Sequence, residues 1–284
     1  MKLTDKFSAL APRYEAVLSD VWGVLHNGVA AFPEAGDALV RFRAQGGTVV
    51  LISNAPRPGG YVARMLERLG VPREAYDDIV TSGDVTRDYV AGRPGGRVFH
   101  IGPERDHSVF TGLDAPFAPL EAADYAICTG LFDDDTETPE DYRALLGALR
   151  ARGLFMVCAN PDKVVERGDR LVYCAGAVAD LYGELGGEVL YAGKPYRPIY
   201  DLARAKVAAA RGREVALQRM LAIGDSVRTD LRGAVDLGVD CLFVTAGIHA
   251  EELGHREDPD PTALAAMFAA VGQLPKAVTR RLAW

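Results

Sequence analysis

The stretch Val17-Leu18-Ser19-Asp20-Val21-Trp22-Gly23-Val24-Leu25 places a carboxylate after an apolar run and a glycine three residues later. The run predicts a buried strand over 15–21, with Asp20 near its carboxyl end. Two later stretches continue the pattern: Ala192-Gly193-Lys194-Pro195 and Leu221-Ala222-Ile223-Gly224-Asp225-Ser226-Val227-Arg228-Thr229-Asp230. Strand-end Asp residues, a loop Lys and a further Asp together predict a Mg²⁺-assisted phosphoryl-transfer site.

Strands and helices alternate around this first stretch. Apolar runs predict strands over 15–21, 48–52 and 79–82, and helical spacing predicts helices over 33–44 and 60–69. This rhythm predicts an α/β fold with a doubly wound, parallel, Rossmann-like sheet. Ligands of such sheets bind beyond the carboxyl ends of the strands. Asp20, Ser53 and Asp225 each follow a strand, so we expect them to converge on one crevice.

The middle of the chain differs in charge. Segment 84–183 holds 17 acidic and 10 basic residues, a net charge of −7, whereas the remainder holds 22 of each and is neutral. This segment also has its own alternation, with strands predicted over 97–101, 125–128 and 155–158 and a helix over 139–152. We therefore predict a catalytic core formed by 1–83 and 184–284, with a second α/β module inserted over 84–183.

Composition excludes several classes of protein. The chain has 284 residues, is 49% hydrophobic and carries a net charge of −7. Without a Lys/Arg cluster we expect no nucleic-acid or membrane-surface partner. The first residues lack the apolar segment of a secretory signal, so a cytoplasmic location is expected. The four cysteines are predicted to be buried thiols, with a zinc site or a catalytic thiol as the alternatives.

The acidic residues have specific candidate roles. Asp20 is a candidate nucleophile that attacks phosphorus to form an aspartyl-phosphate; otherwise it is a turn carboxylate. Asp20, the backbone carbonyl of Trp22 and Asp225 together match the oxygen ligands that Mg²⁺ prefers. Asp230 either supports the metal site, directly, through water or by orienting Lys194, or is a first-turn acid favoured by the helix dipole.

The polar residues of the loops complete the candidate site. Backbone amides near Trp22 and Gly23 are candidates to face a phosphoryl oxygen, and Ser53 and Asn54 are candidates to bind a non-bridging one. Ser53 is equally well explained as a helix cap. Lys194 is a candidate cation for the transferring phosphoryl group, the alternative being a solvated loop charge.

Four motifs in order resemble the haloacid dehalogenase-like hydrolase superfamily, in particular its NagD-like branch (subfamily IIA). They are Asp20-x-x-Gly23-Val24-Leu25, Ile52-Ser53-Asn54, Gly193-Lys194-Pro195 and Gly224-Asp225-x-x-x-x-Asp230. The resemblance implies a phosphatase with Asp20 as nucleophile, Ser53 as phosphate ligand, Lys194 as stabilising cation and Asp225 as Mg²⁺ ligand. It also implies that the insert is a mobile cap of the C2 type that carries substrate specificity.

Trp22 departs from the family pattern. The family has an Asp at this position, which protonates the leaving group and then activates the attacking water. Indole does neither, and positioned acid–base catalysis contributes roughly 10²–10⁴-fold to the rate. The consequence is a slow enzyme, a substrate with a good leaving group, or another acid–base residue, for which His26 is the nearest titratable candidate. Trp22 is alternatively a hydrophobic lid over the substrate.

Three functions compete on these residues. The leading hypothesis is a Mg²⁺-dependent phosphatase acting on a small phosphorylated metabolite such as a sugar phosphate, nucleotide or aryl phosphate. The second is a catalytically impaired protein that binds a phosphorylated ligand or has a regulatory role. The third is carbon–halogen hydrolysis, against which the Asp225/Asp230 pair argues because halide displacement needs no metal. An apolar face of the insert is a candidate homodimer interface.

Overall fold

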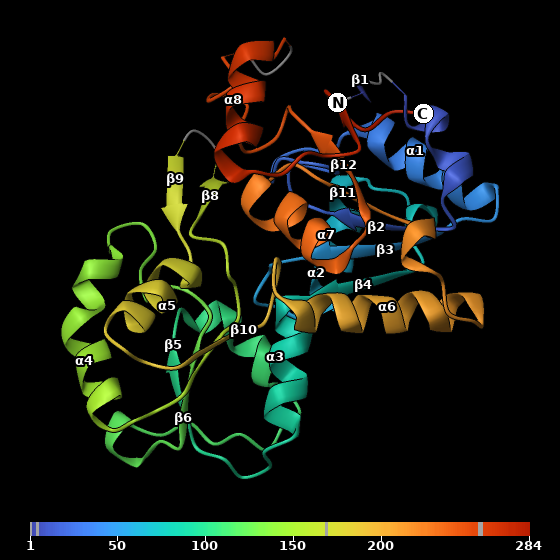
Figure 1. Ribbon diagram of the computed structural model, residues 1–284. Helices are drawn as coiled ribbons and strands as arrows, with labels where there is room; N and C mark the ends of the chain where they lie inside the picture. The colour runs from blue at the N-terminus through green and yellow to red at the C-terminus, as the bar shows by residue number, and fades with distance from the viewer. Residues whose placement is uncertain (1, 4–5, 168–169, 255–257) are drawn as a thin grey trace. The chain divides into compact units, whose positions relative to one another are not determined.

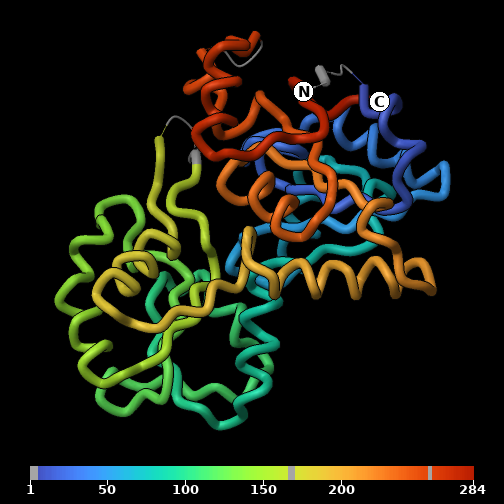
Figure 2. Tube along the Cα trace, viewed as in Figure 1, coloured from blue at the N-terminus to red at the C-terminus, as the bar shows by residue number. Residues whose placement is uncertain are grey.

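The computed structural model describes residues 2–3, 6–167, 170–254 and 258–284, which form two compact units. Unit 1 comprises Met1–Ser53, Val62–Val80 and Tyr200–Trp284, and unit 2 comprises Asn54–Tyr61 and Thr81–Ile199. Figure 2 follows the chain by colour: the blue and orange-to-red segments make up most of unit 1, and the green-to-yellow segment makes up most of unit 2. The chain therefore contains an α/β module inserted into another.

The sheet of unit 1 has the strand order β1-β13-β12-β11-β2-β3-β4 (Figure 1). The strand bounds are Lys2–Leu3 for β1, Ala16–Asp20 for β2, Thr48–Ser53 for β3, Asp78–Thr81 for β4, Met220–Gly224 for β11, Asp240–Val244 for β12 and Ala277–Thr279 for β13. The pairs from β1 to β3 are parallel. Every residue of β3 and β11 is buried, as expected for parallel strands covered on both faces.

The strand order of unit 1 reverses between β2 and β11. From β2 the chain continues to β3 and β4 on one side, whereas β11, β12 and β13 follow one another on the other side. In doubly wound sheets such a switch point is where the loops diverge and leave room for a ligand. The register pairs Ser19 with Ile223, so the carboxyl ends of β2 and β11 lie level.

The helices of unit 1 connect these strands. They are α1 (Pro33–Ala44), α2 (Gly59–Leu69), α6 (Arg197–Arg211), α7 (Arg232–Leu237) and α8 (Pro261–Val271), of which α2 and α6 begin in residues of unit 2. The predicted helix over 33–44 matches α1, which has Pro33 in its first turn. Before α7 the chain forms a π-helical turn, Val227–Leu231.

Unit 2 has its own parallel sheet, in the order β10-β7-β6-β5. Its strands are β5 (Val98–Ile101), β6 (Tyr125–Cys128), β7 (Met156–Cys158) and β10 (Val189–Tyr191), and its helices are α3 (Ser82–Ala91), α4 (Arg143–Ala151) and α5 (Ala175–Glu184). An antiparallel ribbon joins β8 (Val164–Arg167) to β9 (Arg170–Tyr173). Helices α4 and α5 supply Leu146, Leu149 and Val178 to the core of this unit.

The observed boundaries of the second module are wider than the predicted 84–183. Helix α3 begins at Ser82 because Thr81 caps it: the Thr81 side chain accepts from Asp84 N–H, and Asp84 Oδ2 accepts from Thr81 N–H. At the C-terminal end of the module, the predicted boundary places residues 188–191 in the catalytic core. They form β10, which pairs with β7 in the sheet of unit 2.

Two further predictions concern residue environment. All four cysteines, Cys128, Cys158, Cys174 and Cys241, are free and buried, as the sequence predicted. Within the described ranges, helices that combine the length and the hydrophobicity needed to cross a bilayer do not occur.

Candidate active site

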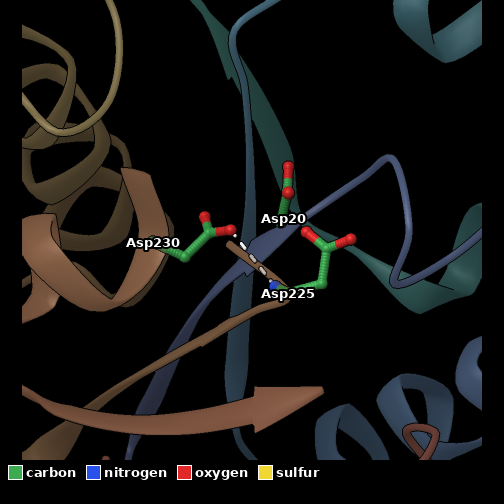
Figure 3. A group of neighbouring side chains, drawn as sticks. All are labelled: Asp20, Asp225 and Asp230. Atoms are coloured by element: carbon green, nitrogen blue, oxygen red, sulfur yellow. Dashed lines mark hydrogen bonds between the residues drawn. The ribbon is translucent and has the colours of Figure 1, made fainter. Parts of the chain in front are cut away.

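Three carboxylates meet at the switch point of unit 1. Asp20 ends β2, Asp225 follows β11, and Asp230 lies in the π-helical turn, yet one oxygen of each lies within 4.8 Å of the others. Figure 3 shows the three side chains directed toward one another. Asp225 and Asp230 are buried and Asp20 is half-buried. The structure thus brings together the three acidic residues that the sequence singled out.

Asp225 fits closely between two glycines. Its Oδ2 accepts a 2.8 Å hydrogen bond from the backbone N–H of Ile248. A Cβ atom on Gly23 would lie 2.0 Å from Asp225 Oδ2, and one on Gly247 would lie 1.9 Å from it. Gly23 also has a φ of +80°, which side chains disfavour. Glycine is therefore required at both positions for the carboxylate to occupy this place.

Asp230 supports the loop that carries Asp225. Its Oδ2 accepts from Asp225 N–H at 3.2 Å (dashed in Figure 3) and from Ser226 N–H at 3.1 Å. The Ser226 hydroxyl accepts from Arg228 N–H and Thr229 N–H and so caps the turn. A Cβ atom on Gly224 would lie 2.1 Å from Asp230 Cγ. Asp230 therefore orders the turn in addition to joining the cluster.

Ser53 lies at the same edge of the sheet. Asp20 pairs in register with Ile52, so Ser53 stands one residue beyond the strand partner of Asp20. Asp20 Oδ1 accepts from Val21 N–H at 2.7 Å, and Ser53 is 9% exposed. The hydroxyl and the carboxylate thus follow neighbouring strands, as the pattern of strand-end polar residues predicted.

Trp22 and His26 form one aromatic pair on the loop after Asp20. Their rings meet edge to face at 5.0 Å, and a Cβ atom on Gly28 would lie 2.5 Å from Trp22 Cη2. Trp22 is 37% exposed, whereas His26 is fully buried. His26 Nδ1 accepts from Gly28 N–H at 2.8 Å, and its Nε2 is buried without a hydrogen-bond partner. Burial lowers the pKa of His26 to about 4, so the ring is uncharged near neutral pH. It packs against the indole.

Asn54 and Lys194 lie in unit 2, in one buried network. Asn54 Oδ1 accepts from Lys194 N–H at 2.7 Å, while Asn54 Nδ2 donates to Asp162 Oδ1 at 2.9 Å and to the Lys194 carbonyl at 3.2 Å. A Cβ atom on Gly193 would lie 2.0 Å from Ser82 Oγ and 2.3 Å from Asn54 Oδ1. The Asn54 amide, predicted to bind phosphate, is thus engaged in holding the backbone of Lys194.

The donor set of unit 1 fits a hard divalent cation. Carboxylates crowded this closely repel one another and are costly to bury as anions unless positive charge compensates them. Mg²⁺ takes one or two carboxylates with other oxygen ligands. Asp20 and Asp225 supply such carboxylates. The Trp22 carbonyl, a candidate third oxygen ligand, belongs to the loop in which the next residue, Gly23, lies against Asp225.

Sequence reasoning missed two contributors to this arrangement. Gly247 and Ile248 follow β12 and position Asp225, one by its lack of a side chain and the other by its backbone N–H. In unit 2, Asp162 of the turn Asn160-Pro161-Asp162 accepts from Asn54 Nδ2, a partner that the sequence did not predict. The position of Gly247, a glycine shortly after the end of a predicted strand, is the sequence feature that could have indicated Gly247 and Ile248.

Comparison with known proteins identifies the family. The model of haloacid dehalogenase-like hydrolases matches residues 17–115, and a HAD-hydrolase-like model matches residues 191–271. A solved haloacid dehalogenase-like hydrolase of Brucella suis 1330 is 48% identical, covers 99% of this chain and 100% of its own, and superposes with a TM-score of 0.87. The chain belongs to the haloacid dehalogenase-like hydrolase family. The resemblance predicted from the four motifs is thereby confirmed.

More distant relatives carry names of activities. The acid sugar phosphatase of Staphylococcus aureus is 23% identical over 93% of this chain and 99% of its own length. A glycerol phosphate phosphatase of Mycobacterium tuberculosis, solved in complex with calcium, is 26% identical, with a TM-score of 0.64 over 84% of this chain and 68% of its own. These relatives are named as phosphatases, which agrees with the enzyme class expected from the sequence.

Proposed function

We propose that this chain is a divalent-metal-dependent phosphatase that acts on a small phosphorylated metabolite. The observation that carries the proposal is the convergence of Asp20, Asp225 and Asp230 at the switch point of unit 1. Family membership and the phosphatase names of the relatives support the same class of reaction.

Asp20 is the proposed nucleophile. An oxygen of its carboxylate attacks phosphorus and forms an aspartyl-phosphate, which water then hydrolyses. Ser53, at the end of the neighbouring strand, is the proposed ligand of a non-bridging phosphoryl oxygen, and the Trp22 amide is proposed to serve the same charge. The Gly23 amide, expected to do so as well, instead donates to the His26 carbonyl at 2.8 Å. The catalytic role of Lys194 is a proposal that rests on the family motif.

Asp20, Asp225 and the Trp22 carbonyl are the residues that would hold Mg²⁺, with Asp230 in support. The ion, when bound, neutralises the phosphoryl oxygens and polarises phosphorus toward attack. Asp225 is held in place by Ile248 N–H and by the two glycines that flank it. Asp230 holds the amides of Asp225 and Ser226, so the protein fixes its own ligands before a metal arrives.

Hydrolysis of 4-nitrophenyl phosphate tests the proposal. The wild type should release 4-nitrophenol with Mg²⁺, lose this activity on chelation and recover it when Mg²⁺ is restored. Asp20→Asn should be inactive while it unfolds at about the wild-type temperature. Metal-independent turnover, or activity retained in Asp20→Asn, would refute the proposed mechanism.

A second function is favoured by one observation, the indole at position 22. A protein that binds a phosphorylated ligand without hydrolysing it would keep the carboxylate cluster and would not need the general acid that the family has at position 22. Its signature would be a thermal stabilisation by Mg²⁺ with inorganic phosphate, with no release of 4-nitrophenol by the wild type. Turnover at a measurable rate would exclude it.

A further inference from the structure

The loop after Asp20 lies over the carboxylate cluster and carries almost no acid–base chemistry. Gly23 lies against the Asp225 carboxylate, so the backbone of Trp22, between Asp20 and Gly23, lies close to these two carboxylates. Between Asp20 and Glu34, His26 is the sole titratable residue in the sequence. This loop therefore offers the site a buried imidazole and an indole, which packs on His26 and Gly28 and neither donates nor accepts a proton in catalysis.

Three titratable side chains of unit 1 that are candidates for acid–base catalysis are engaged in contacts within the unit. His26 is fully buried beneath the indole, and its Nδ1 accepts from Gly28 N–H. Asp230 Oδ2 accepts from two backbone N–H groups. His249 Nε2 accepts from Val227 N–H at 3.3 Å, and its Nδ1 lies 3.1 Å from Glu252. Asp230 and His249 thus have structural partners in place of a leaving group, and the His26 Nε2, which has no hydrogen-bond partner, is buried.

We propose that this site selects phosphoryl donors whose leaving group departs as a stable anion: aryl phosphates, acyl phosphates and phosphoanhydrides. This inference rests on the proposed phosphatase function and narrows its substrate class. It separates this chain from phosphatases of alkyl phosphates, such as the relative named for glycerol phosphate.

The chemistry of the first step explains the restriction. An Asp20 oxygen forms a bond to phosphorus, the bond from phosphorus to the leaving oxygen breaks, and its electron pair stays on that oxygen. No proton is transferred, so the barrier follows the basicity of the leaving anion. A phenolate of the tyrosine type, with a conjugate-acid pKa of about 10, leaves far more easily than an alkoxide.

The second step balances in the same way. Water attacks the aspartyl-phosphate, the bond from phosphorus to Asp20 breaks, and its electron pair returns to the carboxylate while the proton of the water passes to the solvent. Because this step is common to all donors, kcat levels off for the best ones. The ratio kcat/KM reports the first step and therefore the leaving group.

The experiment measures kcat/KM with Mg²⁺ for 4-nitrophenyl, phenyl and benzyl phosphate. All three carry an aromatic ring, so they differ mainly in the basicity of the leaving oxygen. We expect the wild type to decline steeply along the series, with benzyl phosphate near background. Trp22→Asp should raise benzyl phosphate hydrolysis by ~10²–10⁴-fold and 4-nitrophenyl phosphate hydrolysis much less, because a positioned acid matters most for a basic leaving group.

Trp22→Asn is the matched control, with nearly the same shape as Asp and no proton to give. It should fail to rescue benzyl phosphate, whereas a gain equal to that of Trp22→Asp would overturn the proposal and assign the effect to removal of the indole. A wild type that hydrolyses benzyl and 4-nitrophenyl phosphate equally well would also overturn it. If neither the wild type nor Trp22→Asp acts on 4-nitrophenyl phosphate, the proposed phosphatase function itself fails.

Discussion

Two groups of three aspartates lie in the two units, and they differ in almost every respect. Asp133, Asp134 and Asp135 of unit 2 are consecutive in sequence and largely exposed. Asp134 pairs with Arg105, and Asp135 pairs with Arg170 at 3.0 Å. The backbone N–H of Asp135 and the hydroxyl of Thr136 donate to Asp133. This group is a solvated turn in which arginines already compensate the charge.

The group in unit 1 is assembled from separate parts of the chain. Asp20 and Asp225 are more than two hundred residues apart, and backbone N–H groups and glycines fix Asp225 and Asp230 in buried positions. Local acid density therefore does not distinguish the proposed metal site from the exposed turn. What distinguishes the proposed site is the convergence of strand-end carboxylates, held by the backbone at a switch point.

The largest predicted effect is on activity, and it comes from the same Asp-to-Asn substitution made in each of the two groups of aspartates. Asp225→Asn should lower Mg²⁺-dependent hydrolysis of 4-nitrophenyl phosphate by at least ~10³-fold, because a bound metal contributes several kcal/mol to the barrier. Asp135→Asn should change it by less than about twofold, since it removes only an exposed ion pair with Arg170, and such pairs contribute about 0–1 kcal/mol to stability. Equal losses in the two variants would contradict the distinction.

Glycine to alanine changes should also diverge between the units. Gly247→Ala places a methyl group where Asp225 Oδ2 lies, and a displacement of about 1 Å at a reacting group costs ~10²-fold in rate. Gly147→Ala, in α4 of unit 2, meets no atom within 4 Å and should stabilise the helix by ~0.5–1 kcal/mol. Steady-state kinetics and thermal unfolding of both variants check these outcomes. Full activity in Gly247→Ala would show that the Asp225 carboxylate tolerates being moved.

Asparagines distinguish buried from exposed hydrogen bonding. Asn54→Ala removes four hydrogen bonds in the buried network of unit 2 and should lower the free energy of unfolding by about 2–4 kcal/mol. Asn27→Ala removes two bonds on an exposed turn of unit 1 and should cost less than about 1 kcal/mol. Denaturant titration of both variants measures the difference. A small loss in Asn54→Ala would mean that water replaces the amide.

The smallest expected effect concerns acid stability. Burial, and to a lesser degree the charge of His107, lowers the pKa of His100 from 6.5 to about 4. The unfolded chain therefore binds the proton more readily, and stability falls as the pH drops from 6.5 toward 4; near pH 5 the loss from His100 is about 2 kcal/mol.

His100→Gln tests this window. Glutamine does not titrate and offers a polar group to the Thr129 hydroxyl, which lies 2.9 Å from His100 Nε2. Its unfolding free energy should decline less with acid than that of the wild type, and His26 of unit 1, with a similarly lowered pKa, should account for part of the remaining slope. An unchanged slope would show that His100 titrates normally in the folded protein.

Much of the fold was predictable because parallel strands are continuous apolar runs. The predicted strand over 125–128 and helix over 33–44 match β6 and α1. The ribbon β8–β9 was missed because its strands pair mainly with each other and bury little, with Leu171 and Tyr173 exposed. The prediction placed β10 in the wrong sheet. An apolar run indicates that a strand is buried, but it does not indicate which strand it pairs with.

The sequence by itself determined which residues end the strands, since covalent order and apolar periodicity are local properties. It thereby identified Asp20, Ser53 and Asp225 as candidate site residues, and it showed that position 22 carries a tryptophan and no carboxylate. Tertiary structure decided the rest. It alone placed Gly247 and Ile248 around Asp225, turned Asn54 toward the Lys194 backbone and buried His26 beneath an indole. Those outcomes depend on contacts between segments distant in the chain, where packing and hydrogen-bond geometry select the partners.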